Sequence, residues 1–448
     1  MSLPSNSLSR GAANFTVSNS DVVSTNIDNN TSATHASANS LTFSGKSVVD
    51  SGQRGEFLPQ LPPVNTEPHG FAQDIPKDAT SIIDRSIAAS KPDSPQLLAT
   101  GIPDKERLLA TIRTISEIQP IENADNIEVA TVDGWKVVVA KSDFQPGQPV
   151  IFCEIDSILP VRDEFEFLRK SSHTVLPDGS EGFRLRTIKL RGQLSQGLVL
   201  PLSTLGNDVP VNPGDDVTSK LGIKKYEPAG GLPEGDYIKG RFPHFIPKSN
   251  EVRIQNLQSE FDTFKDKKFY VSEKLDGTSS TFYLRNNEYG VCSKNYQLQT
   301  DTDHPLCQIA SENNIESKLR GLGRNIAIQA EVIGQKIGGN PYALKDNEIY
   351  VFNIYDIDKL SYMKKDEMEK ICQEIGLPTC PVVSDSKELA ATVADVLVDA
   401  DGKSKVNNKK NREGLVYVFD GNNPKERISF KAVSNNYLLK EKPIKKAR

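Results

Sequence analysis

The chain has 448 residues, a length that allows two or three domains. Its hydrophobic fraction of 37% is low for a fully globular protein and indicates that part of the chain is disordered. The formal net charge of -5 excludes a polycationic protein, so any binding of nucleic acid must use local basic patches.

The cysteines are scattered along the chain without a Cys-x-x-Cys pair, at Cys153, Cys292, Cys307, Cys372 and Cys380. This spacing argues against a disulfide frame or a zinc site and indicates reduced thiols in an intracellular protein. No apolar run approaches the length of a membrane span, and the N-terminus lacks an apolar signal core. We therefore expect no membrane association and a cytoplasmic or nuclear location, with an organelle left open.

Residues 1–100 are rich in Ser, Asn, Thr and Pro and have almost no apolar periodicity. Such a composition cannot bury enough surface to offset the loss of chain entropy on folding. We predict a disordered tail, with a short helix around Thr80–Ala89 as an open alternative within it.

A β-rich module is expected over residues 105–228. Asp133-Gly134 separates two apolar runs, Ile127–Val132 and Trp135–Ala140, which is a strong hairpin signal. Further strands are expected at Val150–Ile155, Arg184–Leu190 and Gly197–Pro201, with a turn between the last two. Short strands at this spacing predict a small barrel or sandwich.

The segment Lys189–Gly197 resembles the oligonucleotide-binding (OB) modules that grip tRNA, and such barrels bind nucleic acid on one face. A basic stripe accompanies it. In a strand, alternate residues share a face, so Arg184 pairs with Arg186, and Lys189 with Arg191. We predict that these four side chains bind nucleic acid; a solvated strand face is the open alternative.

The Pro- and Gly-rich run Pro228–Gly235 predicts a domain boundary. A helix is then expected over Glu251–Phe264. The strand beginning at Phe269 ends in Glu273-Lys274-Leu275-Asp276-Gly277, which places a lysine among acids where a buried strand runs into a turn. Lysine is rarely buried unless it is paired or functional. Burial and a cationic neighbour lower the pKa of a lysine, and the neutral amine is a nucleophile, so we expect a lowered pKa for Lys274. The alternative is a solvated strand-end lysine before an ordinary Asp-Gly turn.

Five later strands also place polar residues on a face or at an end. The expected strands are Gly290–Asn295, ending in Ser293-Lys294-Asn295; Asn325–Gly334, with Glu331; Ile349–Asp356, with Tyr350 and Phe352; Arg412–Phe419, with Glu413; and a final one at Arg427–Ala432, with Lys431. Amphipathic spacing predicts helices at Asp366–Ile375 and Lys387–Val398. The lysine-rich segment Asp401–Asn411 is expected to be a polar loop that faces nucleic acid or is simply mobile.

These segments, in this order, resemble the motifs of the covalent nucleotidyltransferases: DNA ligases, RNA ligases and mRNA capping enzymes. The resemblance covers most of residues 107–440. It implies that Lys274 is the nucleophile, that Gly277 lets the chain approach the phosphates, and that Asp276 orients the loop. Glu331 would hold the ribose, Phe352 (or Tyr350) would stack on the base, and Glu413 would bind Mg²⁺ or Mn²⁺. Lys431 would be a second catalytic residue, a cation beside the α-phosphate. It would also contact the nucleotide, together with Glu273, Lys294 and Asn295.

Two positions depart from the pattern. Lys294 stands where RNA ligases commonly carry arginine, so that the charge is kept without the bidentate fork. Ser429 stands where many relatives carry a first lysine two residues before Lys431.

A β-module before the nucleotidyltransferase segment, and only about 17 residues after Lys431, resemble the nick-sealing RNA ligases with an N-terminal OB module. We therefore expect an α+β fold: a disordered tail, an OB-like barrel over residues 105–228, a domain of antiparallel sheets flanked by helices over 240–440, and a basic tail over 441–448. The expected enzyme is an ATP-dependent RNA ligase, a monomer that acts on nicked duplex RNA or RNA–DNA hybrids. DNA ligase, GTP-dependent capping enzyme and an inactive nucleic-acid-binding relative are the alternatives.

Overall fold

The computed structural model describes residues 107–440 except 177, 207–209, 228–231, 233–234 and 424–425. The predicted N-terminal tail with its short helix, most of the predicted boundary Pro228–Gly235, and the basic tail 441–448 lie outside the described residues.

The N-terminal β-module contains β1 to β11, which form two sheets with the orders β10-β4-β1-β2-β3 and β11-β5-β7-β6, and the hairpin β8-β9. Its elements are β1 Ala110–Pro120, β2 Ile127–Val132, β3 Trp135–Ala140, β4 Pro149–Cys153, β5 Ser157–Pro160, η1 Asp163–Leu168, α1 Arg169–Ser172, β6 His173–Val175, β7 Glu181–Arg184, β8 Thr187–Leu190, β9 Gln193–Gln196, β10 Leu198–Leu200, η2 Leu202–Leu205 and β11 Lys224–Lys225. Trp135 and Phe152 are fully buried in the core of the first sheet.

A second sheet system carries the lysine motif, and we call it the lysine sheet. Its strands, in order, are β13 Val252–Arg253, β23 Ile428–Val433, β22 Gly414–Phe419, β14 Phe269–Lys274 and β21 Val382–Lys387. One face is covered by η4 Ile254–Leu257, α2 Phe261–Phe264 and α6 Val393–Asp399, whose apolar side chains pack against Phe269, Tyr417 and Phe430.

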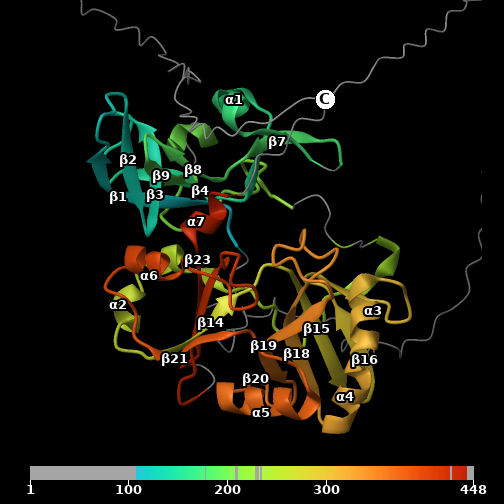
Figure 1. Ribbon diagram of the computed structural model, residues 1–448. Helices are drawn as coiled ribbons and strands as arrows, with labels where there is room; N and C mark the ends of the chain where they lie inside the picture. Colours follow the sequence, from blue (N-terminus) through green and yellow to red (C-terminus); the bar gives the residue numbers. More distant parts are fainter. Residues whose placement is uncertain are drawn as a thin grey trace, which may run out of the picture. The chain divides into compact units, whose positions relative to one another are not determined.

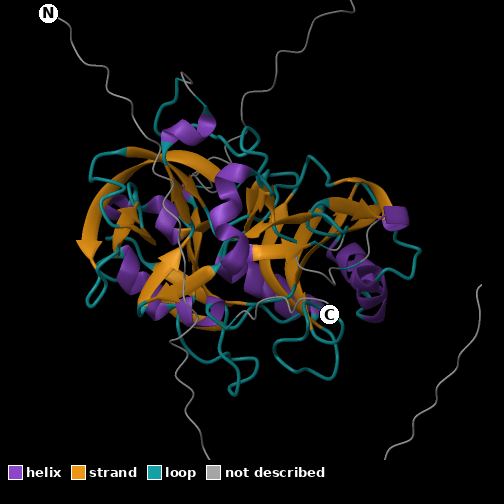
Figure 2. Cartoon of the chain, turned by 90° about the horizontal axis from the view of Figure 1, so that it is seen from above, coloured by secondary structure: helices purple, strands orange, loops and turns teal. Residues whose placement is uncertain are grey.

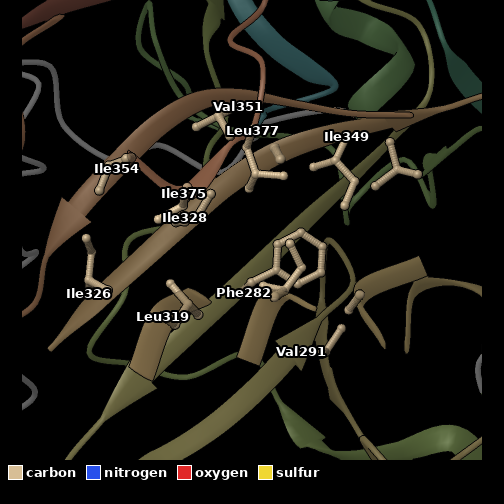
Figure 3. Close-up of a cluster of buried hydrophobic side chains, with 14 of the residues drawn as sticks. Phe282, Val291, Leu319, Ile326, Ile328, Ile349, Val351, Ile354, Ile375 and Leu377 are labelled. Carbon is tan, nitrogen blue, oxygen red and sulfur yellow. The ribbon is translucent and has the colours of Figure 1, made fainter. Parts of the chain in front are cut away.

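A third sheet carries Glu331, and we call it the glutamate sheet. Its strands, in order, are β12 Ile238–Arg241, β17 Tyr296–Leu298, β16 Glu288–Cys292, β15 Thr278–Arg285, β18 Ile326–Ile333, β19 Glu348–Asp356 and β20 Ser361–Tyr362. The helices α3 Pro305–Glu312, α4 Ile315–Leu322 and α5 Lys365–Ile375 cover one face (Figure 1). Figure 3 shows Phe282, Ile328 and Val351 in the core beneath them. The opposite face carries a second apolar cluster that includes Tyr283, Ala327 and Tyr355, and Glu331 of β18 lies at the cleft.

Two short elements complete the described chain: η3 Gly235–Tyr237 precedes β12, and α7 Asn435–Leu438 follows β23. More of the described residues lie in strands than in helices, and the helices are short (Figure 2). Among the described strand pairs, only β13 and β23 are parallel. The predicted α+β class, with a barrel-like β-module and antiparallel sheets flanked by helices, is confirmed.

The predicted hairpin around Asp133-Gly134 is confirmed with both strands at their expected bounds. The Asp-Gly turn is compatible with the right-handed twist of its strands, and Asp133 adopts a φ of 48°. The strands that carry the motif residues are also present, each within a few residues of its predicted bounds.

Four local predictions are wrong. The expected helix Glu251–Phe264 is wrong. The segment contains the two-residue strand β13, a 3-10 turn and a single helical turn, because Val252 and Arg253 pair with Phe430 and Lys431 of β23. The expected helix Lys387–Val398 begins only at Val393, since Lys387 still belongs to β21.

The expected strand Arg184–Leu190 is interrupted after Arg184. The chain changes partner there: β7 pairs with β5, whereas β8 pairs with β9. The predicted turn after Leu190 also contains a strand, Gln193–Gln196.

Candidate active site

A cleft of about 1040 Å³ lies between the lysine sheet and the glutamate sheet and reaches the β-module. Its lining includes nine of the residues predicted to bind nucleotide: Glu273, Lys274, Asp276, Gly277, Lys294, Asn295, Glu331, Phe352 and Lys431. These residues come from five separate segments of the sequence, so the fold brings the predicted motifs together.

Lys274 ends β14 opposite Gly414, the first residue of β22. Its Nζ atom donates a hydrogen bond of 2.6 Å to the carboxylate of Glu413, and both side chains are largely buried. Burial opposes the charged amine, but the carboxylates of Glu413 and Glu331 outweigh it and raise the pKa of Lys274. The expectation of a lowered lysine pKa is therefore wrong for the protein without ligands, which holds an ammonium at this position.

Glu331 reaches the nucleophile loop from β18. Its Oε1 atom accepts a hydrogen bond of 3.0 Å from the backbone N–H of Gly277. Burial, and then the nearby carboxylates of Glu413 and Asp276, raise the pKa of Glu331 to about 8 against the opposing effect of Lys274. A Cβ atom at Gly277 would lie 2.2 Å from the carbonyl oxygen of Val332, so only glycine fits where the loop crosses β18.

Asp276 is held by two tyrosines. Its backbone N–H donates to the hydroxyl of Tyr342 at 2.8 Å, and its carboxylate accepts a hydrogen bond from the hydroxyl of Tyr437. The loop after Lys274 is thus fixed by side chains from elsewhere in the chain, and the orienting role of Asp276 stays a prediction.

Lys431 lies on β23 opposite Val416 and faces the cleft. Burial, and then the charges of Lys274, Arg253 and Arg107, lower the pKa of Lys431 to about 7. This cation is thus poorly compensated in the protein without ligands.

The two neighbours of Lys431 on the same strand face differ from it. Ser429 is buried, and its hydroxyl is without a hydrogen-bond partner among the described residues. Arg427 is bonded to Asp420 and, at 2.7 Å, to Asn353. Arg427 therefore does not take the place of the missing first lysine.

Phe352 lines the cleft, whereas the hydroxyl of Tyr350 donates to Glu348 at 2.6 Å. The geometry favours Phe352 as the stacking residue. Both rings pack against a small apolar cluster beneath the cleft, formed by Leu275, Ile333, Tyr342 and Cys380 with Leu344 and Val406.

Glu273 is almost fully buried, and its carboxylate accepts the backbone N–H of Lys405 at 2.6 Å. Burial raises the pKa of Glu273. The loop Asp401–Asn411 is held further by Asn407, whose amide donates to the carbonyl oxygen of Tyr342 at 2.8 Å. Hydrogen bonds therefore anchor this loop beside the cleft; its contact with nucleic acid stays a prediction.

Lys294 and Asn295 follow β16 at the rim of the cleft, where both are exposed. Their predicted contacts with the nucleotide stay predictions.

The predicted basic stripe is divided between two environments. Arg184 is buried, lines the cleft, and lies over the ring of Tyr226 with its guanidinium carbon 3.6 Å from the centroid. Lys189 and Arg191 are exposed on the β8–β9 hairpin, and Arg186, half-buried, lies between β7 and β8. The four residues do not form one strand face.

A divalent cation fits this site only if a bound nucleotide and water supply some of the coordinating atoms. Glu413 offers a carboxylate, the donor that Mg²⁺ and Mn²⁺ prefer. Within the described residues, however, no group of three or more His, Cys, Asp or Glu side chains could hold a metal ion. Phosphate oxygens and water would have to supply the other ligands.

All the cysteines lie in the described part of the chain, and each is buried and free, as predicted. The helices that the structure describes are all too short or too polar to cross a membrane.

The side chains that support the site include several that were not predicted, among them Arg253, Tyr342 and Tyr437. Arg253 lies beside Lys431 in the β13–β23 pair and bonds Asp156 of the β-module at 3.0 Å. The one hint in the sequence is that Arg253 stands between two apolar residues, Val252 and Ile254. The tyrosines carry no local signal, because their partner, Asp276, is distant along the chain.

Comparison with known proteins identifies two segments. A family model described as an OB-fold domain matches residues 109–202, and one described as RNA ligase matches residues 267–433. A search of curated protein sequences found no match.

Solved structures of mutants of the RNA ligase of Naegleria gruberi are similar over most of the chain. The one with AMP and manganese has 39% sequence identity and a TM-score of 0.68, covering 74% of this chain and 98% of that chain. The one with ATP and manganese has 38% identity, a TM-score of 0.67 and the same coverage. A mutant structure described as apo has 39% identity and a TM-score of 0.68, covering 74% of this chain and 97% of that chain.

Proposed function

Because this chain belongs to the ATP-dependent RNA ligases, which use ATP as the donor of AMP together with a divalent metal ion, we propose that it seals nicks in duplex RNA or RNA–DNA hybrids through a lysyl-AMP intermediate on Lys274. The observation that carries the proposal is that Lys274, Glu331 and Lys431 line one cleft and that Lys274 is bonded to Glu413, although the four residues come from separate strand motifs.

In the first step, the ε-nitrogen of Lys274 forms a bond to the α-phosphorus of ATP, and the bond between that phosphorus and the pyrophosphate oxygen breaks. Pyrophosphate leaves with the bonding electrons. The nitrogen needs a free lone pair, so the ammonium held by Glu413 must lose a proton before attack. The negative field of Glu413 and Glu331 has to be offset when the nucleotide binds.

Lys431 suits the phosphates of the nucleotide. Its charge is unfavourable in the protein without ligands, and an anionic phosphate beside it would restore a favourable pair. A metal ion bound by Glu413 and phosphate oxygens would supply positive charge next to the α-phosphate. Glu331 and Phe352 would hold the ribose and the base, with Glu273, Asn295 and Lys294 around them.

In the second step, a 5′-phosphate oxygen of the nicked strand attacks the phosphorus of lysyl-AMP, and the bond to the lysine nitrogen breaks. In the third, the 3′-hydroxyl attacks the activated 5′-phosphate, and AMP leaves. No oxidant or reductant is needed, because all three steps are substitutions at phosphorus that change no oxidation state. The free energy comes from the phosphoanhydride bond cleaved in the first step.

Labelled ATP tests the proposal directly. The protein incubated with ATP labelled at the α-phosphate and Mn²⁺ is expected to carry label after denaturation, and the isolated adduct is expected to yield sealed product when chased with nicked RNA duplex. Labelled GTP should give no adduct. A chased adduct that retains its label in the presence of a 5′-phosphate nick would contradict the proposal.

The strand that carries the 3′-hydroxyl should need RNA. A terminal ribose favours the A-form sugar pucker and adds a 2′-hydroxyl that donates and accepts hydrogen bonds, whereas the other strand contributes mainly its phosphate. We expect sealing about 10-fold or more faster for a ribose 3′ end, with RNA or DNA carrying the 5′-phosphate; a tenfold ratio corresponds to 1.4 kcal/mol, about one to two hydrogen bonds. Single-turnover rates on nicks that differ only at the terminal 3′ nucleotides measure this, and equal rates would refute it.

The exposed part of the basic stripe should contact the duplex. Replacing Lys189 and Arg191 with alanine removes two exposed cations from the β8–β9 hairpin, so binding of nicked duplex should weaken by about 10-fold near 0.1 M salt. The salt dependence, log Kd against log salt, should flatten by about 1 to 2 units, while adenylylation by ATP is unchanged. The double variant Lys170→Ala/Lys220→Ala, exposed lysines elsewhere in the β-module, is the control; an identical effect there would argue against a specific surface.

We expect the enzyme to act as a monomer in an intracellular compartment. The buried free cysteines are compatible with a reducing environment. Sedimentation of the protein with and without nicked duplex tests the oligomeric state.

A further inference from the structure

The short helix α7 joins the nucleophile loop to the β-module. Tyr437 and Leu438 are neighbours on it. The hydroxyl of Tyr437 donates to the carboxylate of Asp276, two residues after Lys274. The side chain of Leu438 is buried in the β-module core with Trp135 and Phe152. Figure 1 shows α7 beside β4 and β23.

The position of Tyr437 is fixed from both ends of the helix. Ser434 caps α7 by accepting the backbone N–H of Tyr437 at 3.0 Å, and its own N–H donates to the carbonyl oxygen of Glu413 at 2.8 Å. The Ser434 hydroxyl and the Asn436 amide both donate to the carboxylate of Asp401. The tyrosine hydroxyl is thus part of a rigid arrangement that starts at Glu413 and ends in the β-module.

The bond between Tyr437 and Asp276 is a charge-assisted hydrogen bond in a half-buried setting, which is stronger than a neutral one. Burial and the carboxylate of Asp276 raise the pKa of Tyr437, so the hydroxyl keeps its proton and remains a donor. Together with the Tyr342 hydroxyl, which accepts the Asp276 backbone N–H, it fixes the loop at both its main chain and its side chain.

We propose that Tyr437 is a positioning residue for adenylylation of Lys274, acting through the Asp276 carboxylate, and that α7 makes this positioning depend on the docking of the β-module. The inference rests on the proposed function of Lys274. A small displacement of a nucleophile reduces the rate of its reaction without weakening substrate binding elsewhere in the site. The loss of the Tyr437 hydroxyl should therefore lower the rate constant and leave the KM for ATP unchanged.

Tyr437→Phe removes only the hydroxyl. We expect the rate constant for adenylylation at saturating ATP to fall about 10-fold, with the KM for ATP within error of wild type and the melting temperature lower by only a few degrees, since one charge-assisted hydrogen bond is lost. The matched control is Tyr417→Phe. The hydroxyl of Tyr417 is buried without a partner among the described residues, so its removal should change neither constant.

A double-mutant cycle with Asp276→Asn separates positioning from a general effect on structure. If Tyr437 acts through the carboxylate, Tyr437→Phe should cost less than about threefold in the Asp276→Asn protein, because a neutral amide accepts a weaker bond. Leu438→Ala should lower the same rate constant while leaving the hydroxyl in place, since it loosens α7 from the β-module.

The outcomes are distinct. A Tyr437→Phe protein that labels at the wild-type rate, or a tenfold loss that persists undiminished in the Asp276→Asn protein, overturns the inference alone. A wild-type protein that takes no label from ATP, or a Lys274→Ala protein that labels normally, overturns the proposed function and this inference with it.

Discussion

The Lys274→Ala protein is expected to take up no covalent label from ATP. Lys274 supplies the amine that is proposed to attack the α-phosphorus, and this amine lines the cleft and donates to Glu413. Loss of a nucleophile typically costs several orders of magnitude in rate, so the adduct should fall by at least about 10³-fold, to background. Label that stays with the protein after denaturation at neutral or alkaline pH, where the P–N bond of lysyl-AMP is stable, gives the measurement when followed over time.

Two comparisons make this result specific. Lys268→Ala removes an exposed lysine just before the same strand and should label like wild type. The Lys274→Ala protein should still seal a nick whose 5′ end is already adenylylated, because that reaction needs only the third step. Label on the Lys274→Ala protein at the wild-type level would move the nucleophile elsewhere.

Lys431→Met should make the protein more stable and, at the same time, inactive in adenylylation. Below its folded pKa of about 7, Lys431 carries a charge that burial, Lys274, Arg253 and Arg107 all disfavour. Methionine keeps the apolar stem without that charge. Since the side chain is only half-buried, solvent screening reduces the effect, and we expect a gain of about 2 kcal/mol in the free energy of unfolding near pH 6.5.

The gain should depend on pH with a defined sign. The folded pKa of Lys431 is lowered below its unfolded value, so the unfolded state binds the proton more tightly between pH 7 and about 10.5. Wild-type stability therefore rises through this window relative to the variant, and the advantage of Lys431→Met shrinks. Urea unfolding at pH 6.5 and 9.5 tests this, with the exposed Lys268→Met as control. A gain that is constant with pH, or a loss, would mean that the Lys431 charge is compensated in the fold.

Much of the site could be predicted because each motif residue lies at a strand end or on a strand face. Lys274, Glu331 and Lys431 are polar residues in otherwise apolar strands, and a strand's alternation assigns a face to each of them. The Asp133-Gly134 hairpin was predictable for a similar reason, since its turn chemistry is local. The sequence could not show the direction in which the pKa of Lys274 is shifted. A lysine's pKa depends on partners such as Glu413, which is distant in sequence and becomes a neighbour only through the β14–β22 pairing.

The failed predictions share a cause in tertiary structure. Ile254, Leu257, Phe261 and Phe264 have helical spacing because they all pack beneath the lysine sheet, not because their backbone is one helix. The pairing of Val252 and Arg253 with β23 overrides the local preference. The helices α3 and α4 were not predicted, although the sequence carries signals for them: Pro305 at the start of one and Gly323 at the end of the other.

The hydrogen bonds that build the site join residues far apart in the chain. Lys274 and Glu413 are 139 positions apart, and Asp276 and Tyr437 are 161 apart. Closing such loops is entropically costly, and contacts of this kind form late in folding. During synthesis, a nascent chain whose Lys274 has already left the ribosome still lacks Glu413, Lys431 and Tyr437, which complete the site. The enzyme is therefore translated for most of its length as an inert β-rich polypeptide, and competence for ATP arrives only as its final strand and helix emerge.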